Sequence, residues 1–252
     1  MTELQEKIDF IAEYAQHLMG CGIHTSRVIR NTKRVGESQG FDIKISTLSK
    51  TLIITLFHKE TERFYSEVVE VPLLPISFSH NSELSALSWE AVDKKLPFAS
   101  LKEKYYDITS SKSMAMWKIM FLVGLANTAF CRIFGGDYLA MVSVLVATLI
   151  GFLCRTFMIR RHINHYIVFI VTAFVSSLIA SSSILFSATS DVAIATSVLF
   201  LIPGVPLING FIDILEGHSI TGIGRLTNAC LLIVSISIGL YITLILFKDS
   251  LI

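Results

Sequence analysis

The chain has 252 residues, of which 52% are hydrophobic and 16% are charged, and its mean hydropathy is +0.63. Soluble domains average about 25% charged residues, so this composition excludes an ordinary soluble protein. The charges are unevenly placed: residues 1–112 hold 14 basic and 15 acidic residues, and residues 113–252 hold 7 and 5. Neither part has the clustered basic face that nucleic-acid binding requires. We therefore expect a soluble-type segment followed by a membrane-type segment, and no nucleic-acid partner.

Residues 1–112 predict a small cytosolic α+β domain. Apolar residues recur at spacings of three and four from Leu4 to Leu18, which predicts an amphipathic helix, and a second helix is expected from Thr25 to about Ser38. Three runs rich in Ile, Val, Phe and Thr predict strands over residues 41–46, 51–57 and 64–71. A further helix follows Glu83 and ends near Pro97. Because the acidic, amphipathic start does not resemble a secretory signal peptide, we expect this domain to stay in the cytosol.

The stretch His24–Arg27 (HTSR) has two interpretations. Thr25 or Ser26 caps the second helix with its hydroxyl, or the helix N-terminus binds an anion. The same helix presents a basic face that is either solvated or placed against anionic lipid headgroups, formed by Arg27, Arg30, Lys33 and Arg34.

Catalytic and metal chemistry have no sequence signature here. His17, His24, His58 and His80 fit no nucleophile or metal pattern. The cysteines are scattered, without a CxxC pair, at positions 21, 131, 154 and 230. The motifs HExxH and GxSxG are also missing. We expect no catalytic residue, no metal site, no cofactor, and buried reduced thiols.

Residues 113–252 predict a membrane domain of five transmembrane helices. A span needs about 20 mostly apolar residues, and five stretches meet or approach this length: Met116–Phe134, Tyr138–Ile159, Tyr166–Ala188, Val192–Asn209 and Leu226–Phe247. Positive charges gather on the cytosolic side of a membrane. A cytosolic N-terminus and a periplasmic C-terminus place six basic residues inside (Lys112, Lys118, Arg155, Arg160, Arg161, Arg225) and two outside (Arg132, Lys248).

Five spans without an internal repeat are half of a typical transporter. We therefore expect a second polypeptide, or a second copy of this chain, to supply the other half. Serines at positions 176, 177 and 181–183 gather in the third span. They either allow close helix packing or line a pathway.

The segment Pro203–Arg225 (PGVPLINGFIDILEGHSITGIGR) interrupts the fourth apolar stretch. Irregular, polar backbone at membrane depth survives only beside protein or a water-filled cavity, and ionisable groups there usually mark a pathway. Pro203 and Pro206 lack a backbone donor and break the helix, while Gly204 and Gly210 permit close approach. A Gly/Pro-interrupted span is typical of a transporter binding site, and glycines 217, 222 and 224 predict a flexible exit.

A polar stripe follows this break. At 100° per residue, Asn209, Asp213 and Glu216 lie within about 60° on one helical face. Partial desolvation of the carboxylates favours their neutral form, which suits proton coupling, and Arg225 is the local counter-charge. The alternative is a re-entrant turn whose acids face cytosolic water. Arg132, near the end of the first span, either snorkels outward or meets an anionic substrate.

The interrupted segment resembles the signature of the threonine/serine exporter family, roughly PGxPLxNGxxDxxxGxxxxGxxR. The matching positions are Pro203, Gly204, Pro206, Leu207, Asn209, Gly210, Asp213, Gly217, Gly222 and Arg225. HTSRV and LSWEAVDKKL in the first segment also fit. Some members of that family are single long chains, and others are split into a larger subunit with five spans and a smaller membrane subunit. By its length this chain resembles the larger, YjjP-type subunit.

The resemblance implies a bacterial inner-membrane exporter that works with a smaller YjjB-type subunit. The split form is associated with export of dicarboxylates, succinate in particular, and the long form with threonine and serine. We therefore predict a subunit of a proton-linked secondary exporter of small organic acids, in the lipid bilayer and open to homo-oligomer formation. The alternatives are a threonine/serine exporter subunit and a membrane sensor whose cytosolic domain binds a ligand.

Overall fold

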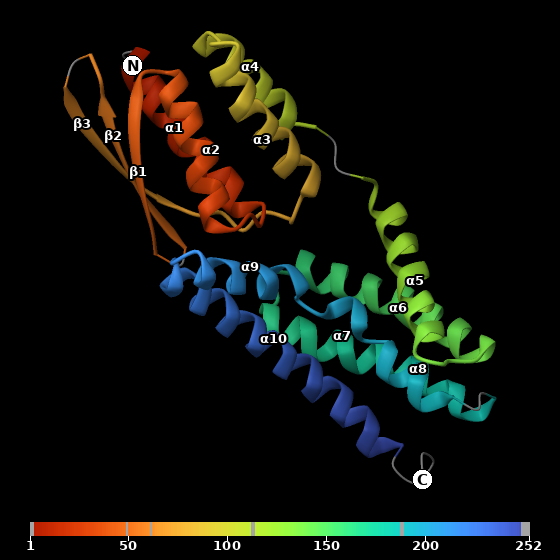
Figure 1. Ribbon diagram of the computed structural model, residues 1–252. Helices are drawn as coiled ribbons and strands as arrows, with labels where there is room; N and C mark the ends of the chain where they lie inside the picture. Colours follow the sequence, from red (N-terminus) through yellow and green to blue (C-terminus); the bar gives the residue numbers. More distant parts are fainter. Residues whose placement is uncertain (1–2, 49, 61, 112–113, 187–188, 248–252) are drawn as a thin grey trace. The chain divides into compact units, whose positions relative to one another are not determined.

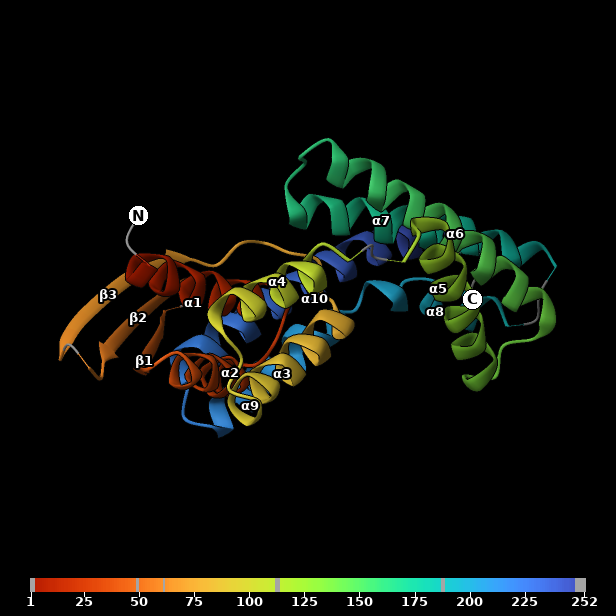
Figure 2. The same ribbon diagram turned by 90° about the horizontal axis from the view of Figure 1, so that it is seen from above.

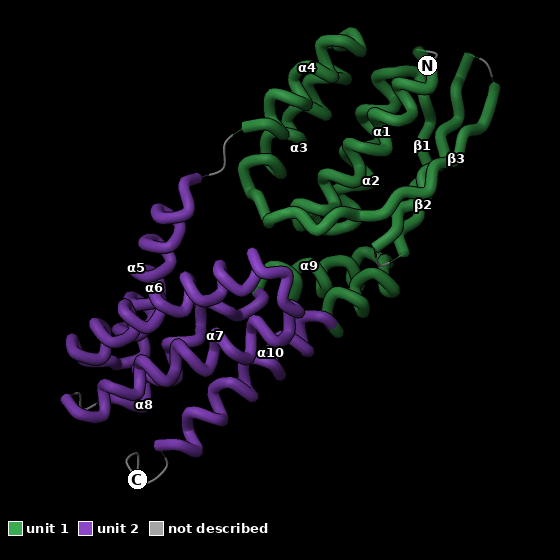
Figure 3. The backbone as a smooth tube through the Cα atoms, turned by 180° about the vertical axis from the view of Figure 1, so that it is seen from behind, with its two compact units in different colours: residues 1–112, 204–227 green, residues 113–203, 228–252 purple. Residues whose placement is uncertain are grey.

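The computed structural model describes residues 3–48, 50–60, 62–111, 114–186 and 189–247. The chain forms two compact units: Met1–Lys112 with Gly204–Thr227, and Ser113–Pro203 with Asn228–Ile252 (Figure 3). The interrupted segment, which the sequence assigns to the membrane domain, thus packs in one unit with residues 1–112, and its membrane placement stays a prediction. Lys112, Lys248 and Ala188, used above for charge bias and span limits, lie outside the described residues.

The first unit contains a three-stranded sheet and two pairs of helices. Strands β1 (Phe41–Leu48), β2 (Thr51–His58) and β3 (Arg63–Glu70) pair antiparallel in the order β1-β2-β3. Helices α1 (Glu3–Gly20) and α2 (Thr25–Ser38) lie against one face of this sheet, and α3 (Phe78–Asp93) with α4 (Phe98–Thr109) covers them on the far side (Figure 1). The predicted α+β domain is therefore present.

The core of the first unit follows from strand alternation and helix periodicity. Leu52, Ile54 and Leu56 alternate along β2 and are fully buried, opposite the apolar face of α1. Each such side chain stabilises the fold by about 1.5–3 kcal/mol. Helix α4 was not predicted, because its sequence is rich in charges. Its buried residues Leu101 and Tyr105 join the same core.

The second unit consists of apolar helices: α5 (Met116–Ile133), α6 (Tyr138–Arg160), α7 (His165–Ala180), α8 (Ser190–Thr196) and the C-terminal part of α10 (Ser219–Leu246). Short 3₁₀ turns cover Ser181–Leu185 and Leu199–Leu201. Helices α6 and α7 lie side by side (Figure 2). Gly151 faces Ser176 closely, and the Ser177 and Thr243 hydroxyls are 2.6 Å apart. These buried serines serve helix packing.

Four of the described helices are long and apolar enough to cross a membrane: α5, α6, α7 with its 3₁₀ extension, and α10. The helix pair Ser190–Leu201 and Gly204–Leu215 adds a fifth if this broken pair is one span. The expected fourth stretch, Val192–Asn209, is therefore not one continuous helix. The last helix starts at Ser219, seven residues before the expected Leu226.

Candidate functional site

In the interrupted segment, the chain forms helix α9 and then turns sharply into helix α10. Helical structure stops at Leu201 and resumes at Gly204, where α9 (Gly204–Leu215) begins. Pro206 lies in the first turn of α9, where a missing N–H costs no helical bond. Gly217, with φ of +88°, supports the tight turn into α10. Gly222 and Gly224 lie within α10 (Ser219–Leu246), so the expected flexible exit was wrong for these two glycines.

Helix α9 and the start of α10 approach each other closely. A Cβ at Gly222 would lie 2.7 Å from the Gly210 carbonyl oxygen and 2.6 Å from an Ile214 side-chain carbon. A Cβ at Gly210 would in turn lie 2.8 Å from the Leu226 side chain. Glycine at both positions lets the two backbones pack almost in contact. This packing holds the polar face of α9 at a fixed position.

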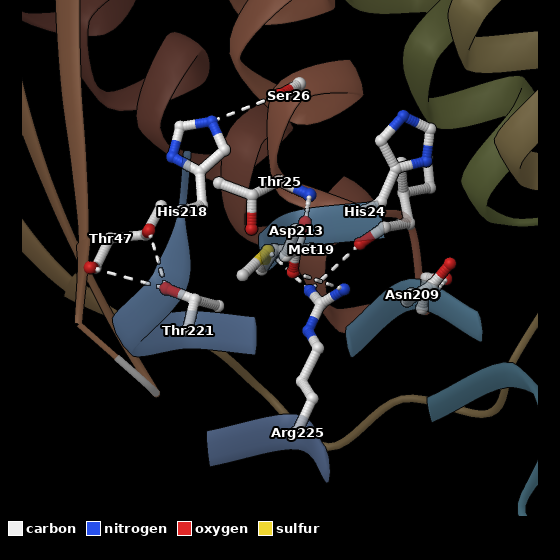
Figure 4. Close-up of polar contacts among 12 residues, drawn as sticks. Met19, His24, Thr25, Ser26, Thr47, Asn209, Asp213, His218, Thr221 and Arg225 are labelled. Atoms are coloured by element: carbon white, nitrogen blue, oxygen red, sulfur yellow. Dashed lines mark hydrogen bonds and ion pairs between the residues drawn. The ribbon is translucent and has the colours of Figure 1, made fainter. Parts of the chain in front are cut away.

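Asp213 is the buried centre of that polar face. Its side chain has no exposed surface, and its Oδ1 accepts a 2.7 Å hydrogen bond from the backbone N–H of Thr25, the first residue of α2 (Figure 4). Its Oδ2 lies 3.1 Å from Nη1 of Arg225, an ion pair without hydrogen-bond alignment. A helix N-terminus carries partial positive charge. Asp213 therefore faces positive charge on two sides.

Arg225 links the second turn of α10 to the connection between α1 and α2. Its Nη2 donates a 2.9 Å hydrogen bond to the Ile23 carbonyl and lies 3.2 Å from the Met19 sulfur (Figure 4). Taking two charges out of water costs several kcal/mol per ion and is repaid only with good geometry and further hydrogen bonds. The Thr25 N–H supplies one such bond to Asp213, and the Ile23 carbonyl supplies one to Arg225.

The rest of the predicted stripe meets the same connection. Asn209 Nδ2 donates to the Gly22 carbonyl at 2.7 Å. The Glu216 carboxylate lies 3.9 Å from His24 Nε2 and 4.0 Å from Arg30 Nη1. All three stripe residues therefore contact the segment from Gly22 to Arg30. We call these contacts, with the Asp213–Arg225 pair, the polar seam.

Two further contacts extend the polar seam along the start of α10. His218 Nε2 lies 3.1 Å from the Ser26 hydroxyl, and Thr221 Oγ1 lies 2.8 Å from Thr47 Oγ1 at the end of β1 (Figure 4). Burial lowers the pKa of His24, an effect that the nearby Glu216 carboxylate opposes. His24 is therefore held toward its neutral form beside the seam.

The cap expected at the start of α2 was wrong. His24 occupies the N-cap position without a side-chain cap, and the hydroxyl of Thr25 has no hydrogen-bond partner. The Asp213 carboxylate takes the place of a cap, from 188 residues along the chain. The anion-binding interpretation of HTSR thus describes the geometry, with a side chain of the same protein as the anion. That partner has no local signal in the sequence.

A pocket of about 330 Å³ adjoins the polar seam. Its lining combines one cation, two amides, an imidazole and apolar groups: Gly22, Ile23, His24, Arg27, Phe78, Asn81, Ser82, Val205, Ile208 and Asn209. None of these lining residues is acidic. Ligand sites commonly have this size and this mixture of apolar wall and few polar groups. The lining thus carries one positive charge and no negative charge.

Arg132 has a different setting. It lies in the last turn of α5, donates a 3.1 Å hydrogen bond to the Gly136 carbonyl and stacks on the Tyr138 ring at 5.3 Å. These contacts fix the turn between α5 and α6 within the second unit. The structure therefore does not include Arg132 in the polar seam.

Comparison with known proteins gives one family. The family described as "Putative threonine/serine exporter" matches residues 9–247. A Klebsiella aerogenes protein named "Probable succinate transporter subunit YjjP" is 29% identical over 240 residues, covering 89% of this chain and 88% of its own. The protein of the same name from Escherichia coli strain K12 is 27% identical over 242 residues, covering 90% and 89%. No solved structure matches.

Proposed function

Because the chain belongs to the threonine/serine exporter family, we propose that it is one subunit of a secondary exporter of small dicarboxylates such as succinate. The family and the apolar helices make it a multi-pass membrane protein of transporter type. In this proposal it lies in the bacterial inner membrane with its N-terminus in the cytosol and its C-terminus in the periplasm. A smaller YjjB-type membrane subunit completes the transporter, in keeping with the word "subunit" in the relatives' names.

We base the proposed substrate class on the pocket beside the polar seam. Arg27 offers a guanidinium that pairs with a carboxylate, and Asn81 and Asn209 offer amide donors. Phe78 and Ile208 offer apolar surface to a short methylene chain. The lining side chains carry one guanidinium and no carboxylate. We base the choice of a dicarboxylate on this charge balance.

We assign the transport role to the polar seam. Asp213 and Arg225 form a buried pair at the corner where α9 turns into α10, and the pocket shares Asn209 with that seam. A substrate carboxylate near Arg27 changes the charge balance beside the pair. We propose that substrate binding and the state of the Asp213–Arg225 pair are coupled in this way.

Efflux from cells tests this function. Cells loaded with labelled succinate or labelled threonine would express this chain alone, the smaller subunit alone, or both. Succinate efflux should require both chains and should exceed threonine efflux. Threonine efflux at equal or higher rate, or full succinate efflux with the smaller subunit alone, would contradict the proposal.

Substitution of Arg27 tests the pocket. Arg27→Ala removes the pocket's guanidinium and should raise the half-saturating succinate concentration by about 10- to 150-fold, since a hydrogen bond to a charged group contributes roughly 1.5–3 kcal/mol. Lys33→Ala is the matched control, because Lys33 is an exposed cation on the same helix and does not line the pocket. Equal effects of the two changes would show that general positive charge, and not the pocket, attracts the substrate.

A further inference from the structure

Three residues that can bind a transition metal meet in the first unit at the end of α1. His17 lies in its last turn, and Cys21 follows one residue after the helix ends, four positions later on the same face. His80 lies in the first turn of α3. One ligand atom from each of the three lies within 4.8 Å of the other two. The sequence predicted no metal site because His80 comes 63 residues after His17, a spacing that fits no linear motif.

We propose that His17, Cys21 and His80 form a binding site for a transition metal of the Zn²⁺ type. The site would have two nitrogen ligands and one sulfur ligand, with a fourth position open to water or an external ligand. This set excludes Mg²⁺ and Ca²⁺, which take oxygen ligands. Zn²⁺ and its neighbours take imidazole and thiolate together.

The separation of the two histidine nitrogens agrees with tetrahedral coordination. Zn–N bonds of about 2.0–2.1 Å at tetrahedral angles place two nitrogen ligands roughly 3.3–3.4 Å apart. His17 Nε2 and His80 Nδ1 are 3.4 Å apart. The two rings are tilted by 31° to each other, with their centroids 5.6 Å apart. The pair thus holds the separation that a metal requires.

Outer contacts fix the orientation of His80. Its second ring nitrogen, Nε2, lies 3.2 Å from the Ser111 hydroxyl, and its backbone N–H donates to the Ser77 hydroxyl at the cap of α3. A metal-bound histidine usually donates its free ring N–H to such an oxygen, which sets the tautomer. With Nε2–H donating to Ser111, Nδ1 is the nitrogen left for the metal.

Burial supplies the dry surroundings of a bound metal. Cys21 is 2% exposed and His80 is 9% exposed.

The site connects directly to the polar seam. Cys21 immediately precedes Gly22, whose carbonyl accepts from Asn209, and Met19 beside it contacts Arg225. A metal that ties the end of α1 to α3 would therefore fix the connection that holds Asp213 and Arg225. The metal site itself does not depend on what the protein exports.

Cobalt binding to the purified full-length protein in detergent tests the site. Co²⁺ should bind at about one ion per chain, with the near-ultraviolet absorption of a cobalt–thiolate bond, and Zn²⁺ should displace it. Cys21→Ser should abolish that absorption, and His80→Ala should weaken binding by at least the roughly 10–100-fold known for loss of outer contacts. The controls Cys230→Ser and His162→Asn remove an exposed cysteine and an exposed histidine, and should bind as the original protein does.

Two results would overturn the proposal. The first is a failure of the original protein to bind Co²⁺ or Zn²⁺ stoichiometrically at micromolar concentration, a measurement that needs no variant and no assumption about folding. The second is thiolate absorption that persists in Cys21→Ser and vanishes in Cys230→Ser. In either case the contact between His17 and His80 is an ordinary hydrogen bond within the domain core.

Discussion

Replacement of Asp213 by asparagine tests the buried Asp213–Arg225 ion pair separately from the other contacts of the polar seam. The asparagine oxygen still accepts from the Thr25 N–H, but the neutral amide leaves the Arg225 guanidinium, whose side chain is 18% exposed, without its counter-charge. Breaking one side of a buried pair costs about 3–5 kcal/mol. At about 2–4 °C per kcal/mol for a chain of this size, the thermal midpoint should fall by roughly 6–20 °C.

Glu216→Gln is the matched control, because the Glu216 carboxylate is 34% exposed and lies 3.9–4.0 Å from its partners. Such a partly exposed pair contributes about 0–1 kcal/mol, so its midpoint should shift by less than about 4 °C. The measurement is thermal unfolding of the purified protein in detergent. Equal midpoints for Asp213→Asn and the original protein would refute the buried-pair reasoning.

The double variant Asp213→Leu/Arg225→Met distinguishes a structural role from a transport role. Apolar replacement of both partners is often neutral or stabilising, although the Thr25 N–H then loses its acceptor and the Ile23 carbonyl its donor, at a cost of about 1–3 kcal/mol each. The double variant should therefore recover only part of the stability that Asp213→Asn loses. Succinate efflux should be absent, because neither charge is left. Recovery of efflux together with stability would show that Asp213 only holds the fold.

Three smaller changes test other parts of the corner. Gly222→Val forces a side chain onto the α9 backbone and should cost about 1–3 kcal/mol, whereas Gly204→Ala, with no atom within 4 Å of an added Cβ, should be near neutral in the same unfolding measurement. Asn209→Ala leaves the Gly22 carbonyl without its donor and should cost about 1 kcal/mol of stability; an unchanged midpoint would contradict this bond. Because burial lowers the pKa of His24 from 6.5, the unfolded chain binds its proton first, so stability should fall as pH drops below about 6.5, and His24→Gln should flatten that dependence.

Local sequence patterns predicted the elements of the first unit well. The three strands and the first two helices occur where apolar alternation and periodicity place them, because β2 and α1 each bury one regular face. The pattern failed for α4, in which only Leu101 and Tyr105 are buried and many of the other residues are charged. It also failed for α10, whose first two turns hold glycines that a local interpretation treats as flexible. Both errors concern helices that tertiary packing stabilises.

The candidate site was half visible in the sequence. The stripe of Asn209, Asp213 and Glu216 follows from helical spacing alone, and Arg225 was expected as a partner of the carboxylates. Its other partners were not visible, since the Thr25 N–H and the Gly22 carbonyl belong to the backbone and lie about 190 residues earlier in the chain. The same reason hid the His17–Cys21–His80 cluster. Side-chain types and spacing cannot reveal contacts that only the fold creates.

The soluble-type segment, residues 1–112, forms one compact unit with residues 204–227, so its role cannot be separated from that of the interrupted segment. The sequence offered a sensor hypothesis, in which deletion of residues 1–110 would spare transport. In the structure, that deletion would remove the Thr25 N–H from Asp213, the Ile23 carbonyl from Arg225 and the Gly22 carbonyl from Asn209. The deletion would remove the residues that cover the Asp213–Arg225 pair together with its hydrogen-bond partners, so the corner between α9 and α10 would lose the contacts that hold it. Loss of transport after such a deletion would therefore be no measure of sensing. A regulatory role for this segment is better tested by point changes at the end of α1, which leave the partners of Asp213 in place.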